Sequence, residues 1–167
     1  MSDAKNPVIY RKLTVQEVPL VANLINGYAN LGQMLPRSHH KLYQFLRDFV
    51  GAWDGDQLVG CGALALIWEE LGEIRSLAVL PEWRSRGVGR AMIAYLLDDA
   101  RAMGLTRVFA LTYQQTFFTK LGFLEVPRET LPHKIWGDCL DCPKFPKCDE
   151  IAMILDLDTL AEGEGKQ

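Results

Sequence analysis

Long apolar runs are missing from this sequence of 167 residues. None approaches the roughly 18 residues that a membrane-spanning helix needs, and the amino-terminal segment MSDAKNPVIYRK lacks the apolar core of a secretory signal. An excess of positive charge is missing as well, because the formal net charge is −3. This balance argues against nucleic acid or an anionic membrane as a partner. We therefore expect a cytoplasmic protein that binds neither.

Paired metal-binding cysteine motifs are also scarce. One Cys-x2-Cys motif, Cys139 to Cys142, is followed by Cys148, and a second such motif is absent. Structural zinc, completed by His133 or Asp149, is therefore one alternative beside free or packed thiols and a redox-sensitive disulfide. The metal content of this cluster stays open at this point.

The composition that is present suits a globular protein. Hydrophobic residues make up 49% of the chain and charged residues 23%, which is ordinary for a soluble domain. The length fits a single domain over 1–167, large enough to bury a core without disulfides. The tail, about 159–167, is polar and glycine-rich, so we expect it to be disordered.

Apolar periodicity predicts alternating strands and helices. The expected elements are a strand at 8–13, a helix from Thr14 with apolar Val18, Val21, Leu24, Ile25 and Tyr28, a helix capped by Ser38 with apolar Leu42, Phe45, Leu46 and Phe49, strands at 50–53, 57–68 and 73–80, a helix at 89–103, a strand at 107–112, a helix at 116–121, a strand from Phe123, an irregular excursion at 127–148 and a strand at 151–157. The order β-α-α-β-β-β-α-β-α-β-β predicts an α/β fold with a mixed sheet.

Three apolar patterns predict burial. The strand at 57–68 is nearly continuous apolar sequence, as expected of a strand covered on both faces, and Cys61 within it should belong to the core. Trp68, at its end, is expected to be a packing residue. The helix at 89–103 carries an apolar face made of Met92, Ile93, Leu96, Leu97, Ala100 and Met103.

The loop Arg84 to Arg90, RSRGVGR, lies between a buried strand and a strong helix. Its glycines lack a Cβ, so backbone N–H groups can approach a phosphate closely. The helix that follows offers unpaired N–H groups and the positive end of its dipole, and three arginines add full charges. These features favour a pyrophosphate site over the alternative, an ordinary strand-to-helix turn with solvated arginines.

This loop resembles the signature of the GNAT family of N-acetyltransferases: Arg or Gln, two residues, Gly, one residue, Gly or Ala. Phe117 to Phe123 resembles the aromatic segment that flanks the CoA arm in that family, and the element order agrees. The resemblance implies the GNAT acyl-CoA N-acyltransferase fold, with acetyl-CoA as acetyl donor and the strand before the loop binding pantetheine through its backbone. The donor-binding residues it implies are Leu77, Ala78, Val79, Arg84, Ser85, Arg86, Gly87, Val88, Gly89, Arg90 and Phe118.

Direct transfer to an amine needs the amine to be neutral and correctly placed. Glu73 is the candidate base, against the alternative of an exposed strand-end glutamate. Tyr113 is the candidate acid for the thiolate, against a packing role, because Phe118 stands where many family members carry a tyrosine. The resemblance implies that the strand around Leu77 to Val79, beside a splayed neighbour, supplies a backbone donor for the oxyanion.

A second resemblance concerns the acceptor. Leu35 to Ser38, Glu73 to Val79 and His133 to Glu150 resemble the acetyltransferase domains of N-acetylglutamate synthases in their short, stand-alone form. It implies L-glutamate as a small-molecule substrate in arginine biosynthesis, with the arginine at 37 on a substrate carboxylate. The acceptor-site residues are Leu35, Arg37, Ser76 and Lys134.

Charge supports that acceptor, because a pocket for two carboxylates needs at least two fixed cations. Arg75 and Lys144 are further candidates, although Arg75 shares a strand face with Glu73 and could pair with it instead. Another small amine or amino acid as acceptor, and a non-catalytic acetyl-CoA sensor, remain the alternatives. The oligomeric state stays open, a homodimer included.

Overall fold

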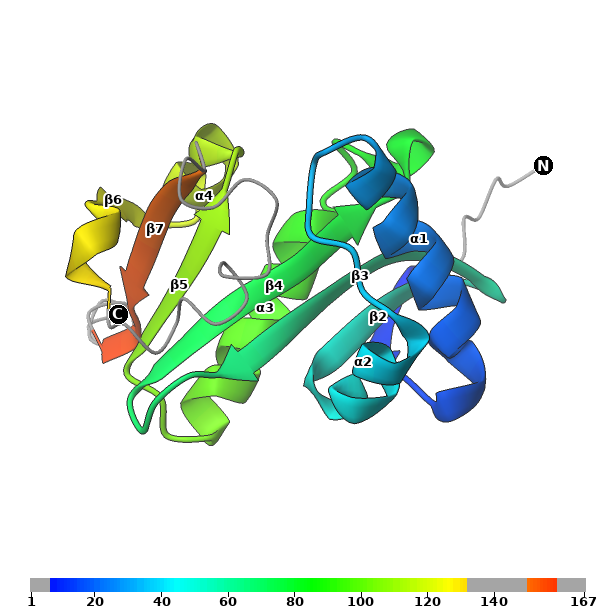
Figure 1. The fold of residues 1–167 in the computed structure, drawn as a ribbon, viewed down its shortest axis with the longest axis horizontal. Helices are drawn as coiled ribbons and strands as arrows, with labels where there is room; N and C mark the ends of the chain where they lie inside the picture. Colours follow the sequence, from blue (N-terminus) through cyan, green and yellow to red (C-terminus); the bar gives the residue numbers. More distant parts are fainter. Residues whose placement is uncertain (1–6, 132–149, 159–167) are drawn as a thin grey trace. The chain divides into compact units, whose positions relative to one another are not determined.

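The computed structural model describes residues 7–131 and 150–158. Its strands are β1 (Ile9–Lys12), β2 (Phe49–Asp54), β3 (Gln57–Leu66), β4 (Leu71–Val79), β5 (Arg107–Thr112), β6 (Leu124–Val126) and β7 (Ile151–Asp156), and its α-helices are α1 (Val18–Asn30), α2 (His39–Gln44), α3 (Val88–Ala102) and α4 (Gln115–Lys120) (Figure 1). The strands form a seven-stranded sheet in the order β1-β2-β3-β4-β5-β7-β6. The β4–β5 pair is parallel and the β5–β7 pair antiparallel, so the predicted mixed α/β sheet is confirmed.

The chain packs as two compact units. The first consists of the chain up to Ala63 together with Ser76–Leu96, and the second of Leu64–Arg75 and the chain from Leu97 onward. The strands β3 and β4 and the helix α3 therefore contribute residues to both units. No helix in the described ranges is long and apolar enough to cross a membrane.

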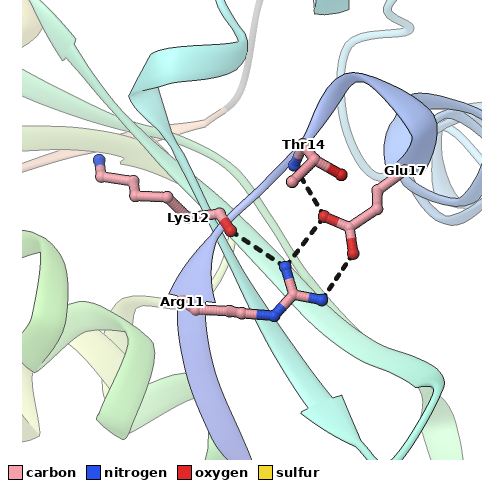
Figure 2. A network of polar contacts seen from close by, with 4 residues as sticks. All are labelled: Arg11, Lys12, Thr14 and Glu17. Atoms are coloured by element: carbon pink, nitrogen blue, oxygen red, sulfur yellow. Dashed lines mark hydrogen bonds and ion pairs between the residues drawn. The ribbon is translucent and has the colours of Figure 1, made fainter.

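The first unit begins with a capping box. The N–H of Thr14 donates to the Glu17 carboxylate at 2.7 Å, and Arg11 donates to both carboxylate oxygens at 3.0 and 2.6 Å (Figure 2). These bonds, that from Arg11 above all, lower the pKa of Glu17 to about 2. The predicted start at Thr14 is confirmed, although the first turn is a 3₁₀ turn, Val15–Glu17, and α1 itself begins at Val18.

The strand β3 is covered on both faces in this unit, as predicted. Cys61 and Ala63 belong to the apolar cluster built with α1 and α2, which lie together over β2 and β3 (Figure 1). The alternate residues face α3: a Cβ at Gly60 would lie 3.0 Å from the Met92 Cε. Glycine therefore lets α3 approach the strand closely. Burial raises the pKa of the Cys61 thiol to about 12, in keeping with its expected place in the core.

The second unit has its own apolar cluster, in which Leu71, Phe109, Leu131 and Ala152 are buried together. The ladder between β4 and β5 runs from Leu71↔Arg107 to Glu73↔Phe109, and β7 pairs with β5 from Asp156↔Arg107 to Ile151↔Thr112. The ends of two ladders therefore fix where Glu73 and Thr112 lie in this unit.

Three apolar side chains for which the sequence predicted burial or packing are exposed. Phe45 is 45% exposed, Trp68 51% and Met103 56%. Each lies just beyond an element that ends earlier than expected: α2 ends at Gln44, β3 at Leu66 and α3 at Ala102. Past those ends the chain leaves the period that would have turned Phe45 and Met103 inward, so these two predictions of burial are wrong. Trp68, expected to be a packing residue, is half-exposed.

Candidate functional site

The loop between β4 and α3 has the backbone that its glycines predicted. Gly87 has φ +82°, and Ser85, which is not a glycine, has φ +64°. A Cβ at Gly87 would meet nothing within 4 Å, so glycine is needed there for its backbone conformation and not for space. The helix α3 then begins at Val88, and the N–H of Ala91 donates to the carbonyl of Gly87 at 3.0 Å.

The start of α3 offers backbone donors next to positive charge. Helix geometry leaves the N–H groups of Val88, Gly89 and Arg90 without an acceptor inside the helix. The side chain of Val88 is buried, whereas Arg84, Ser85, Arg86, Gly87 and Arg90 are exposed. This end of the helix can therefore receive an anion from solvent.

Aromatic rings hold two of the arginines. The Arg84 guanidinium lies 5.2 Å from the ring centroid of Tyr28, and that of Arg86 lies 4.8 Å from the ring of Trp83. The Tyr28 hydroxyl also donates to the carbonyl of Val79 at 2.5 Å. Sequence reasoning placed Tyr28 in the apolar stripe of α1 and missed this role. The signal was the hydroxyl itself, because a partly buried tyrosine needs a hydrogen-bond partner.

The strand that leads to the loop bends at Ser76. This residue has φ +54° inside β4, a conformation that costs a non-glycine residue energy. Its carbonyl accepts from the Cys61 thiol at 3.4 Å. After the bend come Leu77, Ala78 and Val79, of which Ala78 is buried and the other two are partly exposed. A local break in strand geometry thus lies directly beside the predicted pantetheine-binding segment.

Arg37 is held by its backbone. The side chain of Asn26 on α1 accepts from the Arg37 N–H and donates to the Arg37 carbonyl, both at 2.9 Å. Ser38, the next residue, accepts from the N–H of Lys41 and caps α2 as predicted. The backbone of Arg37 is therefore fastened to α1 and adjoins the cap of α2, and the side chains of Leu35 and Arg37 are half-buried. Asn26 carried no motif that would have marked it in the sequence.

Glu73 lies in the second unit and is buried, with only 8% of its surface exposed. Arg75, two residues along β4, donates to its carboxylate through Nε at 2.5 Å. The predicted shared face is confirmed, and of the two alternatives for Arg75 the structure shows the ion pair. Glu73 is therefore a buried, ion-paired carboxylate and not an exposed glutamate at a strand end.

The remaining candidates of this unit differ in exposure. Tyr113 follows β5 and is 38% exposed, whereas Thr112 is buried and accepts from the Gln114 N–H at 2.8 Å. Phe118 is buried on α4 and packs edge-on against Phe117 and Phe123. Tyr113 is thus partly exposed, and the Phe118 ring belongs to an aromatic cluster.

Several predicted residues lie outside the described ranges: His133, Lys134, Cys139, Cys142, Lys144, Cys148 and Asp149. Within 7–131 and 150–158, no three His, Cys, Asp or Glu side chains are grouped so as to hold a metal ion. The zinc alternative concerns the residues outside those ranges and stays a prediction.

A model of the acetyltransferase (GNAT) family matches residues 25–123, which include the second half of α1, the loop at 84–90 and the aromatic segment. The chain belongs to the GNAT family. It is therefore an N-acetyltransferase with the GNAT fold, as the resemblance in the sequence implied.

Two related proteins are similar to this chain over most of its length. An uncharacterised N-acetyltransferase from Chlorobaculum tepidum is 40% identical over 86% of this chain and 93% of that protein. An amino-acid acetyltransferase from Mycobacterium tuberculosis is 39% identical over 72% of this chain and 70% of that protein. These relatives are similar in sequence over most of their own length.

Solved structures agree with the fold of this GNAT enzyme. An N-acetylglutamate synthase from Neisseria gonorrhoeae, in complex with coenzyme A and N-acetyl-glutamate, superposes with a TM-score of 0.82 at 27% identity. That match covers 91% of this chain and 35% of the synthase. A Mycobacterium tuberculosis protein in complex with CoA and NLQ gives a TM-score of 0.77 at 29% identity, over 89% of this chain and 98% of that one.

Proposed function

We propose that this GNAT enzyme transfers an acetyl group from acetyl-CoA to the α-amine of L-glutamate, a reaction of arginine biosynthesis. The observation that carries the first part of the proposal, acetyl-CoA as the donor, is the loop at 84–90. Two left-handed residues, Ser85 and Gly87, lead its backbone into the start of α3, and the segment carries three exposed arginines beside the first helix N–H groups. Its relatives of known structure were solved with coenzyme A, whose pyrophosphate needs such donors.

Two features of the structure support the second part of the proposal, glutamate as the acceptor. Arg37 is held by Asn26, so its guanidinium starts from a fixed backbone and can bind a carboxylate with less loss of freedom. Leu35 and Ser76 are both partly exposed, and Lys134 completes the proposed acceptor site from outside the described ranges. Relatives are named amino-acid acetyltransferases, and one structure holds N-acetyl-glutamate.

The proposed reaction forms one bond and breaks one. The neutral amine nitrogen attacks the thioester carbonyl carbon, a C–N bond forms, and the oxyanion of the tetrahedral intermediate accepts from backbone N–H groups of the Leu77–Val79 strand. The carbon–sulfur bond then breaks with its electron pair on sulfur. The amine proton passes to Glu73, directly or through a water, and Tyr113 protonates the thiolate. The products are the N-acetylated amino acid and free CoA thiol.

A substrate panel tests the proposal. Purified protein with acetyl-CoA is offered glutamate, glutamine, aspartate or spermidine, and the CoA thiol released is followed over time. Release that depends on glutamate supports the proposed acceptor, and release with spermidine alone overturns it. Binding of acetyl-CoA without turnover on any amine would identify a sensor instead.

Substitution of Arg37 tests the carboxylate assignment. The variant R37A should raise the KM for glutamate about 10- to 100-fold, since hydrogen bonds to a charged group are strong, with little effect on the KM for acetyl-CoA. R47A is the matched control, because Arg47 is an exposed arginine of the same unit. Equal constants in R37A and wild type would show that Arg37 does not bind the acceptor.

Substitution of Glu73 tests the base. E73Q keeps the shape of the side chain but cannot accept a proton, so kcat should fall about 100-fold. E69Q, at an exposed glutamate in the turn before β4, is the control. A full-rate E73Q enzyme would leave the carboxylate only its ion pair with Arg75.

A further inference from the structure

We infer that Tyr28 is the positioning residue of the donor site: it fixes the Arg84 guanidinium and the last peptide of β4 at the same time. The inference rests on the proposed use of acetyl-CoA. It adds a residue outside the signature loop, from helix α1, whose effect on the donor acts through two other residues. Tyr28 itself needs no contact with the donor.

The first half of the inference concerns a peptide. The Tyr28 hydroxyl donates to the carbonyl of Val79, and the N–H of Leu80, on the other side of the same peptide, donates to the carbonyl of Val59 at 2.9 Å. Both polar groups of the Val79–Leu80 peptide are thereby engaged. A peptide held at both ends cannot rotate, so the segment enters the loop in one orientation.

That orientation continues into the loop. After Leu80 the chain makes the 3₁₀ turn Pro81–Trp83, closed by the bond from the Trp83 N–H to the Leu80 carbonyl at 2.9 Å. The next residue is Arg84. Its position therefore depends on the peptide that Tyr28 holds.

The second half concerns charge. Arg84 is exposed, and a long exposed side chain loses rotamer freedom when it binds an anion. The face of the Tyr28 ring, 5.2 Å from the guanidinium, attracts the cation and restricts it beforehand. Through its hydroxyl, Tyr28 therefore acts on the strand that is proposed to bind pantetheine. Through its ring, it acts on the arginine that is proposed to bind the pyrophosphate.

The two actions can be separated with two donors. Acetyl-pantetheine carries the thioester and the pantetheine arm but no pyrophosphate, so it reports on the strand alone. Y28F keeps the ring and loses the hydroxyl, whereas Y28L loses both, and Y28M replaces Y28L should the latter fold poorly. Y43L, at an exposed tyrosine of α2, is the control.

The expected results differ between variants. Y28F should lower kcat/KM about two- to ten-fold for both donors alike, as one hydrogen bond would. Y28L should lower kcat/KM for acetyl-CoA by roughly a further two- to five-fold and not that for acetyl-pantetheine, as an exposed cation–π contact would. In an R84A background, Y28F and Y28L should become equal. The KM for glutamate should stay close to wild type, and the thermal midpoint of Y28F should fall by no more than a few degrees, as the loss of one hydrogen bond would lower it.

Two outcomes overturn the inference while the proposed function stands. Y28L could weaken both donors equally, which would indicate a general structural role, or it could change neither. Wild-type protein that neither binds nor uses acetyl-CoA would instead overturn the proposed function, and the inference with it. Calorimetric titration with CoA on the wild type separates these cases before any variant is made.

Discussion

Glu17 shows what one side chain does at the residue scale. Its carboxylate closes the capping box at Thr14 and accepts two bonds from Arg11, whose guanidinium lies 4.4 Å from the ring centroid of Trp53. The start of α1, the edge strand β1 and a buried tryptophan of β2 are therefore linked through one carboxylate. Its ionised form is the one that these contacts favour, which connects the stability of this region to pH.

The pKa of Glu17 is about 2 when folded and near 4.5 otherwise. A lowered pKa stabilises the fold above the unfolded value, and this contribution is lost as pH falls from about 4.5 toward 2. E17Q should therefore be less stable than wild type by about 1 kcal/mol at pH 7, the upper range for partly exposed pairs, with most of the difference lost by about pH 2, where Glu17 is half protonated in the folded protein. Urea unfolding at both pH values measures it, with E82Q, an exposed glutamate, as control. A difference independent of pH would contradict the assignment.

Asn26 supports a second prediction at this scale. N26A removes the two bonds to the Arg37 backbone, so the KM for glutamate should rise roughly five- to ten-fold while the KM for acetyl-CoA stays within about two-fold. N23A, one turn earlier on α1 at an exposed asparagine, should behave as wild type. A parallel rise in both constants would instead indicate a loss of α1 as a whole.

The contacts and burial of single residues were predictable from the sequence where a local pattern indicated them. Arg75 beside Glu73 follows from strand alternation, and the burial of Cys61 from a continuous apolar run. Tyr28 and Asn26 were not predictable, because each acts across the chain: the hydroxyl reaches Val79, and the amide reaches Arg37, 51 and 11 residues away. No local pattern encodes such pairs.

At the element scale, the loop before α3 depends on a backbone that few residues adopt. G87A keeps ample space for its new Cβ but forces an alanine to φ +82°, which should lower the free energy of unfolding by about 1–2 kcal/mol and weaken acetyl-CoA binding. G27A is the matched control: its Cβ also meets nothing within 4 Å, but Gly27 lies within helix α1, so alanine should add roughly 0.5–1 kcal/mol. Unfolding in urea compares them, and an unchanged G87A would refute the conformational explanation.

The elements themselves were predicted better than their ends. Strand β5, Arg107–Thr112, has the predicted bounds, and Ser38 caps α2 as its residue type indicated. Phe45 and Met103 were counted into helices that stop just before them, because periodicity does not say where a helix ends. The bend at Ser76 had no signal either, since serine is not a residue that marks a left-handed conformation.

At the scale of the whole molecule, element order follows from the sequence but strand order does not. The alternation of helical and extended periods predicted a mixed sheet, whereas the insertion of β7 between β5 and β6 depends on pairing between distant segments. Charge is also a property of the whole chain. The net charge of −3 would repel an anionic donor, yet three of its cations are gathered within seven residues, at Arg84, Arg86 and Arg90.

The salt dependence of KM should distinguish attraction of the donor by the loop arginines from repulsion by the net charge of the chain. If the arginines of the loop attract the donor, raising the ionic strength from about 0.01 M to 1 M, where the screening length falls from about 30 to 3 Å, should raise the KM for acetyl-CoA several-fold. Acetyl-pantetheine, which carries no phosphate, should show a KM that salt leaves unchanged. R86A should flatten the dependence for acetyl-CoA, whereas R47A, an exposed arginine outside the loop, should not. Because the net charge would act in the opposite direction, a KM for acetyl-CoA that falls with salt would mean that repulsion by the whole molecule outweighs attraction by the loop.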